Sequence, residues 1–125
     1  MNPSGGRPWP TEITLQQRAR VLVVVFDDGL HAELPCELLR VYSPSAEVRG
    51  HGPGQGVLQT GKEEVNISAI ESVGNYAIKL VFDDGHHTGI YSWDYLHDLG
   101  ANRERYWQDY LAALKAAGHA RRPGA

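Results

Sequence analysis

The sequence spells Val-Phe-Asp-Asp-Gly twice, at residues 25–29 and again at residues 81–85, in a chain of 125 residues. Each copy ends an apolar run, and Asp-Gly after such a run predicts a tight reversal, because glycine adopts the positive φ that the turn requires. With one residue inserted in the second copy, Cys-Glu-Leu-Leu at 36–39 aligns with Trp-Asp-Tyr-Leu at 93–96. We therefore expect two units of strand, turn, strand and short helix around a pseudo-twofold axis; chance convergence on a stable hairpin is the alternative.

Hydrophobic patterns place the strands. Ile13 and Leu15 alternate with polar neighbours, which predicts a half-buried strand, and the unbroken apolar run 21–26 predicts a strand covered on both faces. The return strands of the two hairpins are expected at 30–34 and 88–91. Two further strands are expected at 67–73 and 76–82, joined by Gly74-Asn75.

Capping residues place the helices. Pro35 suits the first position of a short helix over 36–41, and the hydroxyl of Ser92 suits the N-cap of a helix that Gly100 ends. A longer helix is expected from an Asn102 cap to Ala117, with Gly118 as its terminator. Its apolar side is a candidate docking edge for a partner or a second subunit, and comprises Tyr106, Trp107, Tyr110, Leu111 and Leu114.

These elements predict an α+β fold: a mainly antiparallel sheet of about five to six strands, short helices and one longer C-terminal helix. We expect one domain at 11–118 between a flexible leader, 1–10, and a flexible tail, 119–125. A long loop rich in Gly and Pro should span 42–64, and loops of that length are often functional.

Composition limits the classes of function. The chain has 12 Lys and Arg against 15 Asp and Glu, a net charge of -3 that gives no reason to expect nucleic-acid binding. No apolar run is long enough to span a bilayer or to act as a secretory signal, and Cys36 is the single cysteine. We expect a cytoplasmic protein without nucleic-acid or membrane partners.

The candidate catalytic motifs are incomplete. Residues 56–62 match the start of a phosphate-binding loop, but Glu63 stands where a Ser or Thr would hold magnesium. His31 and Glu33 resemble two ligands of a two-histidine, one-carboxylate iron site, yet the chain has too few strands for the barrel of such an oxygenase. Cys36 lies in an amphipathic helix, where a lone cysteine acts as a small apolar residue. The sequence therefore predicts no enzymatic activity.

Residues 38–55 and 73–100, together with the first Phe-Asp-Asp-Gly, resemble the DUF971 family, also called the γ-butyrobetaine hydroxylase-like N-terminal domain. The resemblance covers about residues 10–100 and implies a stand-alone bacterial member. Relatives of this family accompany γ-butyrobetaine and trimethyllysine dioxygenases and Mrp-like iron–sulfur carrier ATPases. The resemblance therefore implies an accessory role.

The resemblance also implies where a zinc ion would bind. In the dioxygenases the domain holds zinc with three cysteines and one histidine, and these positions correspond here to Ser43, Ser45, Val48 and His86. Only the histidine is a zinc ligand, so no structural zinc is expected.

We expect a non-catalytic binding or accessory module with an unidentified protein partner and no cofactor. Arg40 would supply a charged hydrogen-bond fork, and His86 a group that changes charge near neutral pH. The binding surface is predicted to comprise Arg40, Ser43, Ser45, Glu47, Asp84, Gly85 and His86.

The alternative function is metal handling, as an accessory protein in iron or iron–sulfur assembly with weakly bound iron or zinc. Its candidate ligands are His31, His86 and His87 with the neighbouring carboxylates. The two adjacent histidines would point to opposite faces of a strand, so at most one could join a given cluster. Whether the chain is a monomer or a homodimer stays open.

Overall fold

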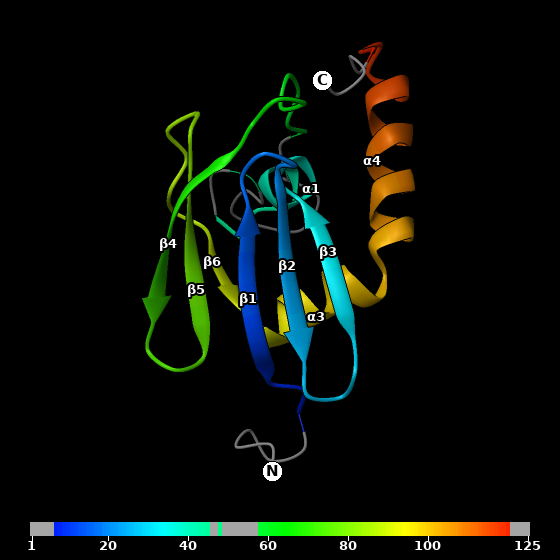
Figure 1. Cartoon of the computed structure of the whole chain (residues 1–125). Helices are drawn as coiled ribbons and strands as arrows, with labels where there is room; N and C mark the ends of the chain where they lie inside the picture. Colours follow the sequence, from blue (N-terminus) through cyan, green and yellow to red (C-terminus); the bar gives the residue numbers. More distant parts are fainter. Residues whose placement is uncertain (1–6, 46–47, 49–57, 121–125) are drawn as a thin grey trace.

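The structure is a computed structural model that describes residues 7–45, 48 and 58–120. In this part of the chain, strands and helices follow in the order β1 (Pro10–Gln16), β2 (Val21–Phe26), β3 (His31–Pro35), α1 (Cys36–Val41), β4 (Ile67–Val73), β5 (Ala77–Phe82), β6 (Ile90–Ser92), α3 (Trp93–Ala101) and α4 (Arg103–Ala116) (Figure 1). None of these helices has the length and apolar character that crossing a membrane requires.

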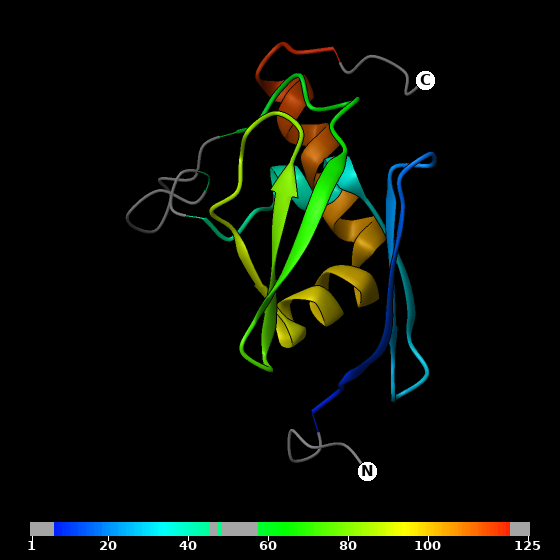
Figure 2. The same cartoon turned by 60° about the vertical axis from the view of Figure 1, so that its left-hand side comes forward.

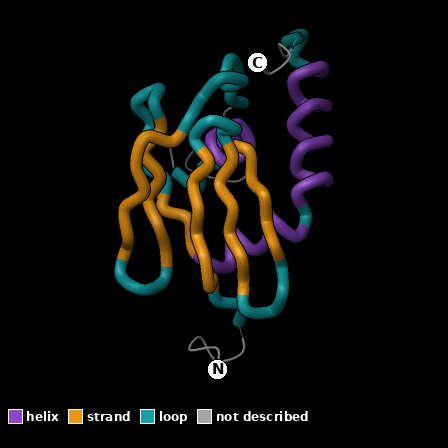
Figure 3. Tube along the Cα trace, in the orientation of Figure 1, coloured by secondary structure: helices purple, strands orange, loops and turns teal. Residues whose placement is uncertain are grey.

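The strands form two antiparallel sheets of three, ordered β1-β2-β3 and β4-β5-β6 (Figure 3). The α+β class is confirmed, but the expectation of one sheet of about five to six strands is wrong. The two sheets lie on either side of α1 and α3 (Figure 2). This arrangement lets both sheets and both helices bury apolar side chains in one core, whereas a single open sheet would need a second layer to cover its other face.

The core draws on both halves of the chain. Leu22 and Val24 of β2 and Leu80 of β5 have no exposed surface, and neither do Leu39 of α1 and Leu96 of α3. All five belong to one cluster of buried side chains. Burying a leucine completely contributes about 1.5–3 kcal/mol, so this shared cluster is what holds the two sheets together.

The two Asp-Gly turns have the same backbone hydrogen bonds. The N–H of Phe26 donates to the carbonyl of Leu30, and that of Phe82 to the carbonyl of His86, both at 2.9 Å. The turn glycines have φ of 93° and 95°, the left-handed region that the sequence predicted for them.

The repeat extends beyond the turns. The hydroxyl of Thr11 donates to the carbonyl of Val25 at 3.2 Å, and that of Ser68 to Val81 at 3.1 Å, at matching positions of β1 and β4. Both outer strands carry a register shift at this point. Turn chemistry does not dictate a bulge on an outer strand, so the two halves repeat a whole three-stranded unit and not only a favourable hairpin.

Strands β2 and β4 match their predicted ranges, 21–26 and 67–73, whereas other predicted boundaries are corrected. β1 begins at Pro10, the last residue of the predicted leader, and the N–H of Trp9 donates to Asp27 Oδ1 at 3.0 Å; residues 1–6 lie outside the described part. Pro35 is the N-cap of α1, whereas it was expected at the first position of the helix. The last strand starts at Ile90, two residues after the predicted start at 88.

The helix caps were partly predicted. Ser92 Oγ accepts from the N–H of Tyr95 at 3.1 Å, as expected. Gly100 lies inside α3, and a Cβ there would come within 2.5 Å of Ala32 Cβ, so glycine serves close packing and not termination. Asn102 precedes α4, but its side chain donates to Asp98 and makes no cap bond.

Candidate functional site

The second Asp-Gly turn is held by charged side chains. Arg40 Nε of α1 and Lys62 Nζ each donate to Asp84 Oδ2 at 2.8 Å, while the N–H of His86 donates to Oδ1 at 3.1 Å. Burial raises the pKa of Asp84, but these hydrogen bonds from Lys62, His86 and Arg40 outweigh it and lower the pKa to about 2. The turn carboxylate is therefore charged at neutral pH.

A cluster of hydroxyl groups continues from this turn. Ser43 Oγ lies 2.8 Å from His86 Nε2 and accepts from the N–H of Ser45 at 3.3 Å. The hydroxyls of Ser45 and Thr88 are 2.6 Å apart. Ser43 has no exposed surface, and 7% of Ser45 and of His86 is exposed. The loop after α1 is thus joined to the segment after the second turn.

The structure brings together five of the seven residues predicted to form the binding surface. They are Arg40, Ser43, Ser45, Asp84 and His86. Gly85 is exposed at the turn itself, and Glu47 lies outside the described residues. All five contribute to two linked hydrogen-bond groups, but four are buried, so they support a surface more than they form one.

Three residues that contact the predicted site residues were not predicted as part of the site. Lys62 donates to Asp84, Gln59 accepts from Arg40, and Thr88 bonds to Ser45. In the sequence Lys62 was considered only as the end of an incomplete phosphate-binding loop, and Asp84 is 22 residues away along the chain. No local pattern marks such a pair, because the contact depends on how the segment before β4 approaches the turn.

The residues at the implied zinc positions do not fit zinc. Ser43 and His86 are in contact, but their polar atoms bind each other and the serine hydroxyls of this cluster are poor zinc ligands. In the described part of the chain no three His, Cys, Asp or Glu side chains group as a metal site would require. His31 Nε2 lies 3.5 Å from Glu33 Oε2, and His87 is exposed on the turn.

Cys36 is buried in the core. It has no exposed surface, and burial raises its pKa to about 11. Its Sγ lies 3.7 Å from Asn66 Oδ1. The residue therefore acts as a small core side chain, as the sequence predicted.

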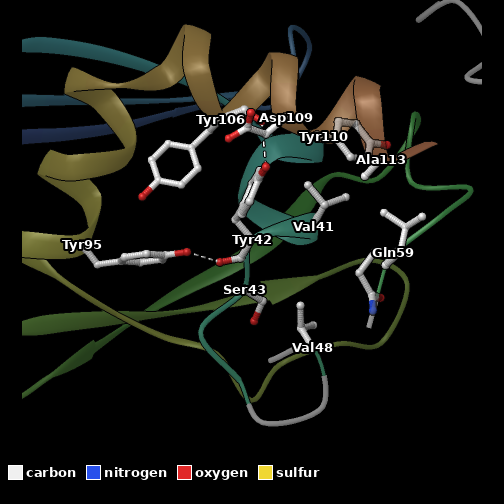
Figure 4. A pocket seen from close by; sticks show the side chains of 11 residues that line it. Val41, Tyr42, Ser43, Val48, Gln59, Tyr95, Tyr106, Asp109, Tyr110 and Ala113 are labelled. Atoms are coloured by element: carbon white, nitrogen blue, oxygen red, sulfur yellow. Dashed lines mark hydrogen bonds between the residues drawn. The ribbon is translucent and has the colours of Figure 1, made fainter. Parts of the chain in front are cut away.

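A groove of about 500 Å³ opens between α4 and the segments that follow α1 (Figure 4). Four tyrosines give it aromatic walls. The lining residues are Val41, Tyr42, Ser43, Val48, Leu58, Gln59, Tyr95, Tyr106, Asp109, Tyr110 and Ala113. Its size falls within the range of pockets that accept a small molecule or a few side chains.

Each tyrosine of the groove donates its hydroxyl to the protein. Tyr42 donates to the carbonyl of Tyr106 at 2.8 Å, and Tyr95 to the carbonyl of Tyr42 at 2.6 Å (Figure 4). Tyr106 donates to Asp98, and Tyr110 to the buried Glu37 at 2.7 Å. The groove therefore presents ring surfaces held in place by internal hydrogen bonds.

The groove and the polar cluster share two residues. Ser43 lines the groove and contacts His86, and Gln59 lines it while accepting from Arg40 Nη1 at 3.1 Å. The charged turn thus supports one wall of the groove.

In the described part of the first half, the Ser43–His86 contact is not repeated at the matching turn. Leu30 occupies the position of His86, and Gly100 the position of Ser43, so neither residue has a polar side chain to form it. The same backbone unit therefore carries a polar, groove-supporting cluster in one half only.

The fold and this site define an internally repeated α+β domain with an aromatic groove beside its second turn. The chain belongs to the family described as gamma-butyrobetaine hydroxylase-like, N-terminal, whose model matches residues 13–97. No curated protein matches the chain.

Solved structures agree with this assignment. Two proteins determined by NMR in solution are 54% and 44% identical, with TM-scores of 0.81; the first match covers 100% of this chain and 93% of the other, the second 96% and 94%. A crystal structure of a protein of unknown function from Acidithiobacillus ferrooxidans, which belongs to the DUF971 family, is 40% identical. That match has a TM-score of 0.62 and covers 74% of this chain and 92% of the other.

Proposed function

We propose that this protein is a non-catalytic accessory module that binds a protein partner through the groove between α4 and α1. The observation that carries the proposal is the set of four tyrosine rings whose hydroxyls are all bonded internally. Such rings supply a large contact area that loses little side-chain entropy on binding, because the protein already holds them in place.

A structural role beside the groove explains the polar cluster around Ser43 and His86 better than a catalytic role does. Ser43 and His86 resemble a nucleophile and a base in their 2.8 Å separation. A nucleophile must reach its substrate, however. Although Ser43 lies at the wall of the groove, it has no exposed surface, and its oxygen also accepts from the N–H of Ser45. We therefore assign the pair to holding the groove wall.

Affinity capture from the native cell tests the proposal with a pair of matched variants. Ala113→Trp places a large side chain in the groove, whereas Ala112→Trp puts the same side chain on an exposed neighbouring position of α4 that does not line it. A partner retained by the wild type and by Ala112→Trp should be lost with Ala113→Trp. Capture of the same proteins by all three would show that the groove is not the binding site.

A further inference from the structure

Building on the proposed function, we propose that the groove binds a basic segment of its partner, with a large apolar or aromatic side chain between the tyrosines and a Lys or Arg beside Asp109.

The walls of the groove select an apolar side chain. Tyr42 at the end of α1, Tyr95 of α3 and Tyr106 of α4 present their rings. Val41 and Val48 add aliphatic surface (Figure 4). Because the tyrosine hydroxyls are already bonded within the protein, a polar side chain entering here would gain few partners for the water it loses. An apolar or aromatic side chain loses no such bonds and can stack on the rings.

The charge of the groove selects a cation. Among the described residues that line it, Asp109 is the only charged one. Its side chain is 64% exposed on α4, at the rim above Tyr42 (Figure 4). Burial and the nearby carboxylate of Asp109 raise the pKa of Tyr42 to about 12. A cationic side chain next to the apolar one would complement this carboxylate.

Arg105 is the internal competitor for Asp109. Its Nη1 lies 4.0 Å from Asp109 Oδ2, and its guanidinium lies 4.6 Å from the centre of the Tyr106 ring. Both side chains of the ion pair are more than half exposed, so solvent weakens it and leaves the carboxylate accessible to a second cation. Arg105 also shows that a cation packs against the ring of Tyr106.

Because Arg105 competes for Asp109, substitutions of these two residues should change the affinity for a bound peptide in opposite directions. Random 12-residue peptides displayed on phage are selected on the full chain, and the best is synthesised and its Kd measured. We expect a large apolar residue next to Lys or Arg in the selected peptides. Asp109→Asn should weaken binding about two- to fivefold, as expected for a rim charge, while Arg105→Gln should strengthen it. Glu104→Gln, on the same helix outside the groove, is the matched control and should leave Kd unchanged.

The outcomes separate this inference from the proposed function. Peptides that lose binding in Ala113→Trp but not in Ala112→Trp, and that are acidic or bind more weakly to Arg105→Gln, would support the groove and overturn the basic partner. Peptides that bind Ala113→Trp as well as the wild type, or no selection of any peptide, would overturn both. Thermal unfolding of each variant confirms that it is folded.

Discussion

Arg40 and His97 hold the same position in α1 and α3. Each binds the second aspartate of the Asp-Asp-Gly turn in the opposite half of the molecule. Arg40 Nε lies 2.8 Å from Asp84 Oδ2, and His97 Nε2 lies 2.7 Å from Asp28 Oδ2. The helix of each half thus crosses to the turn of the other. This reciprocal pairing supports the pseudo-twofold relation that the repeated sequence predicts.

The two pairs should differ in strength, because Arg40 is 9% exposed at its side chain and His97 is 25% exposed. A double-mutant cycle of Arg40→Ala with Asp84→Asn, read by denaturant unfolding, should give a coupling of about 1–2 kcal/mol. The cycle of His97→Ala with Asp28→Asn should give a smaller one. Equal couplings would contradict the role assigned to burial.

Asp84 should make stability depend on pH in acid. Its pKa is lowered from 3.8 to about 2 in the folded protein, so the stability it contributes is present above about pH 4 and is lost as the pH falls through 2. Because water still reaches the carboxylate, we expect about 1–2 kcal/mol, less than the full shift implies. The difference in unfolding free energy between the wild type and Asp84→Asn should shrink between pH 6 and pH 2. A difference that stays constant would refute the assignment.

Gly100 should be required by its contact with Ala32. Gly100→Ala places two Cβ atoms 2.5 Å apart, and the overlap should cost about 1–3 kcal/mol in unfolding free energy. Removing the other Cβ by Ala32→Gly should recover part of the loss in the double variant, although Ala32→Gly alone destabilises the strand. If Gly100→Ala unfolds like the wild type, the helix is not packed this closely.

Cys36 should resist thiol reagents in the folded protein. With a pKa of about 11, roughly one-thousandth of the thiol is ionised at pH 8, and the side chain is completely buried. Ellman's reagent should therefore react only after denaturant is added. An Ala112→Cys variant is the control, since one of its two thiols should react at once. Rapid reaction of the wild type would mean that the core around Cys36 opens readily.

The elements with strong local signals were predicted well. Strand β2 matches its predicted range because six consecutive apolar residues fit a strand covered on both faces, and Ser92 caps α3 because its hydroxyl reaches the first turn. Gly100 was misread since a glycine needed for packing looks the same in sequence as one that ends a helix. Asn102 was misread because its amide has a nearer partner in Asp98.

The candidate site was predicted in part for the same reason. Arg40, Asp84 and His86 were recognised from their motifs, but their mutual contacts and the help of Lys62 were not visible. The groove was missed, because its tyrosines come from the residue after α1, from α3 and from α4, which are distant in the sequence. The apolar side predicted for α4 was the one signal that pointed toward it.

By itself the sequence determined the turns, the strands and the doubling of one structural unit, since apolar runs and turn glycines act over a few neighbouring residues. Only the tertiary structure decided that the strands form two sheets and that a groove opens beside the second turn. Those features depend on pairs such as Arg40 and Asp84, which are 44 residues apart. Contacts of that kind exist only once both halves have packed around a common core.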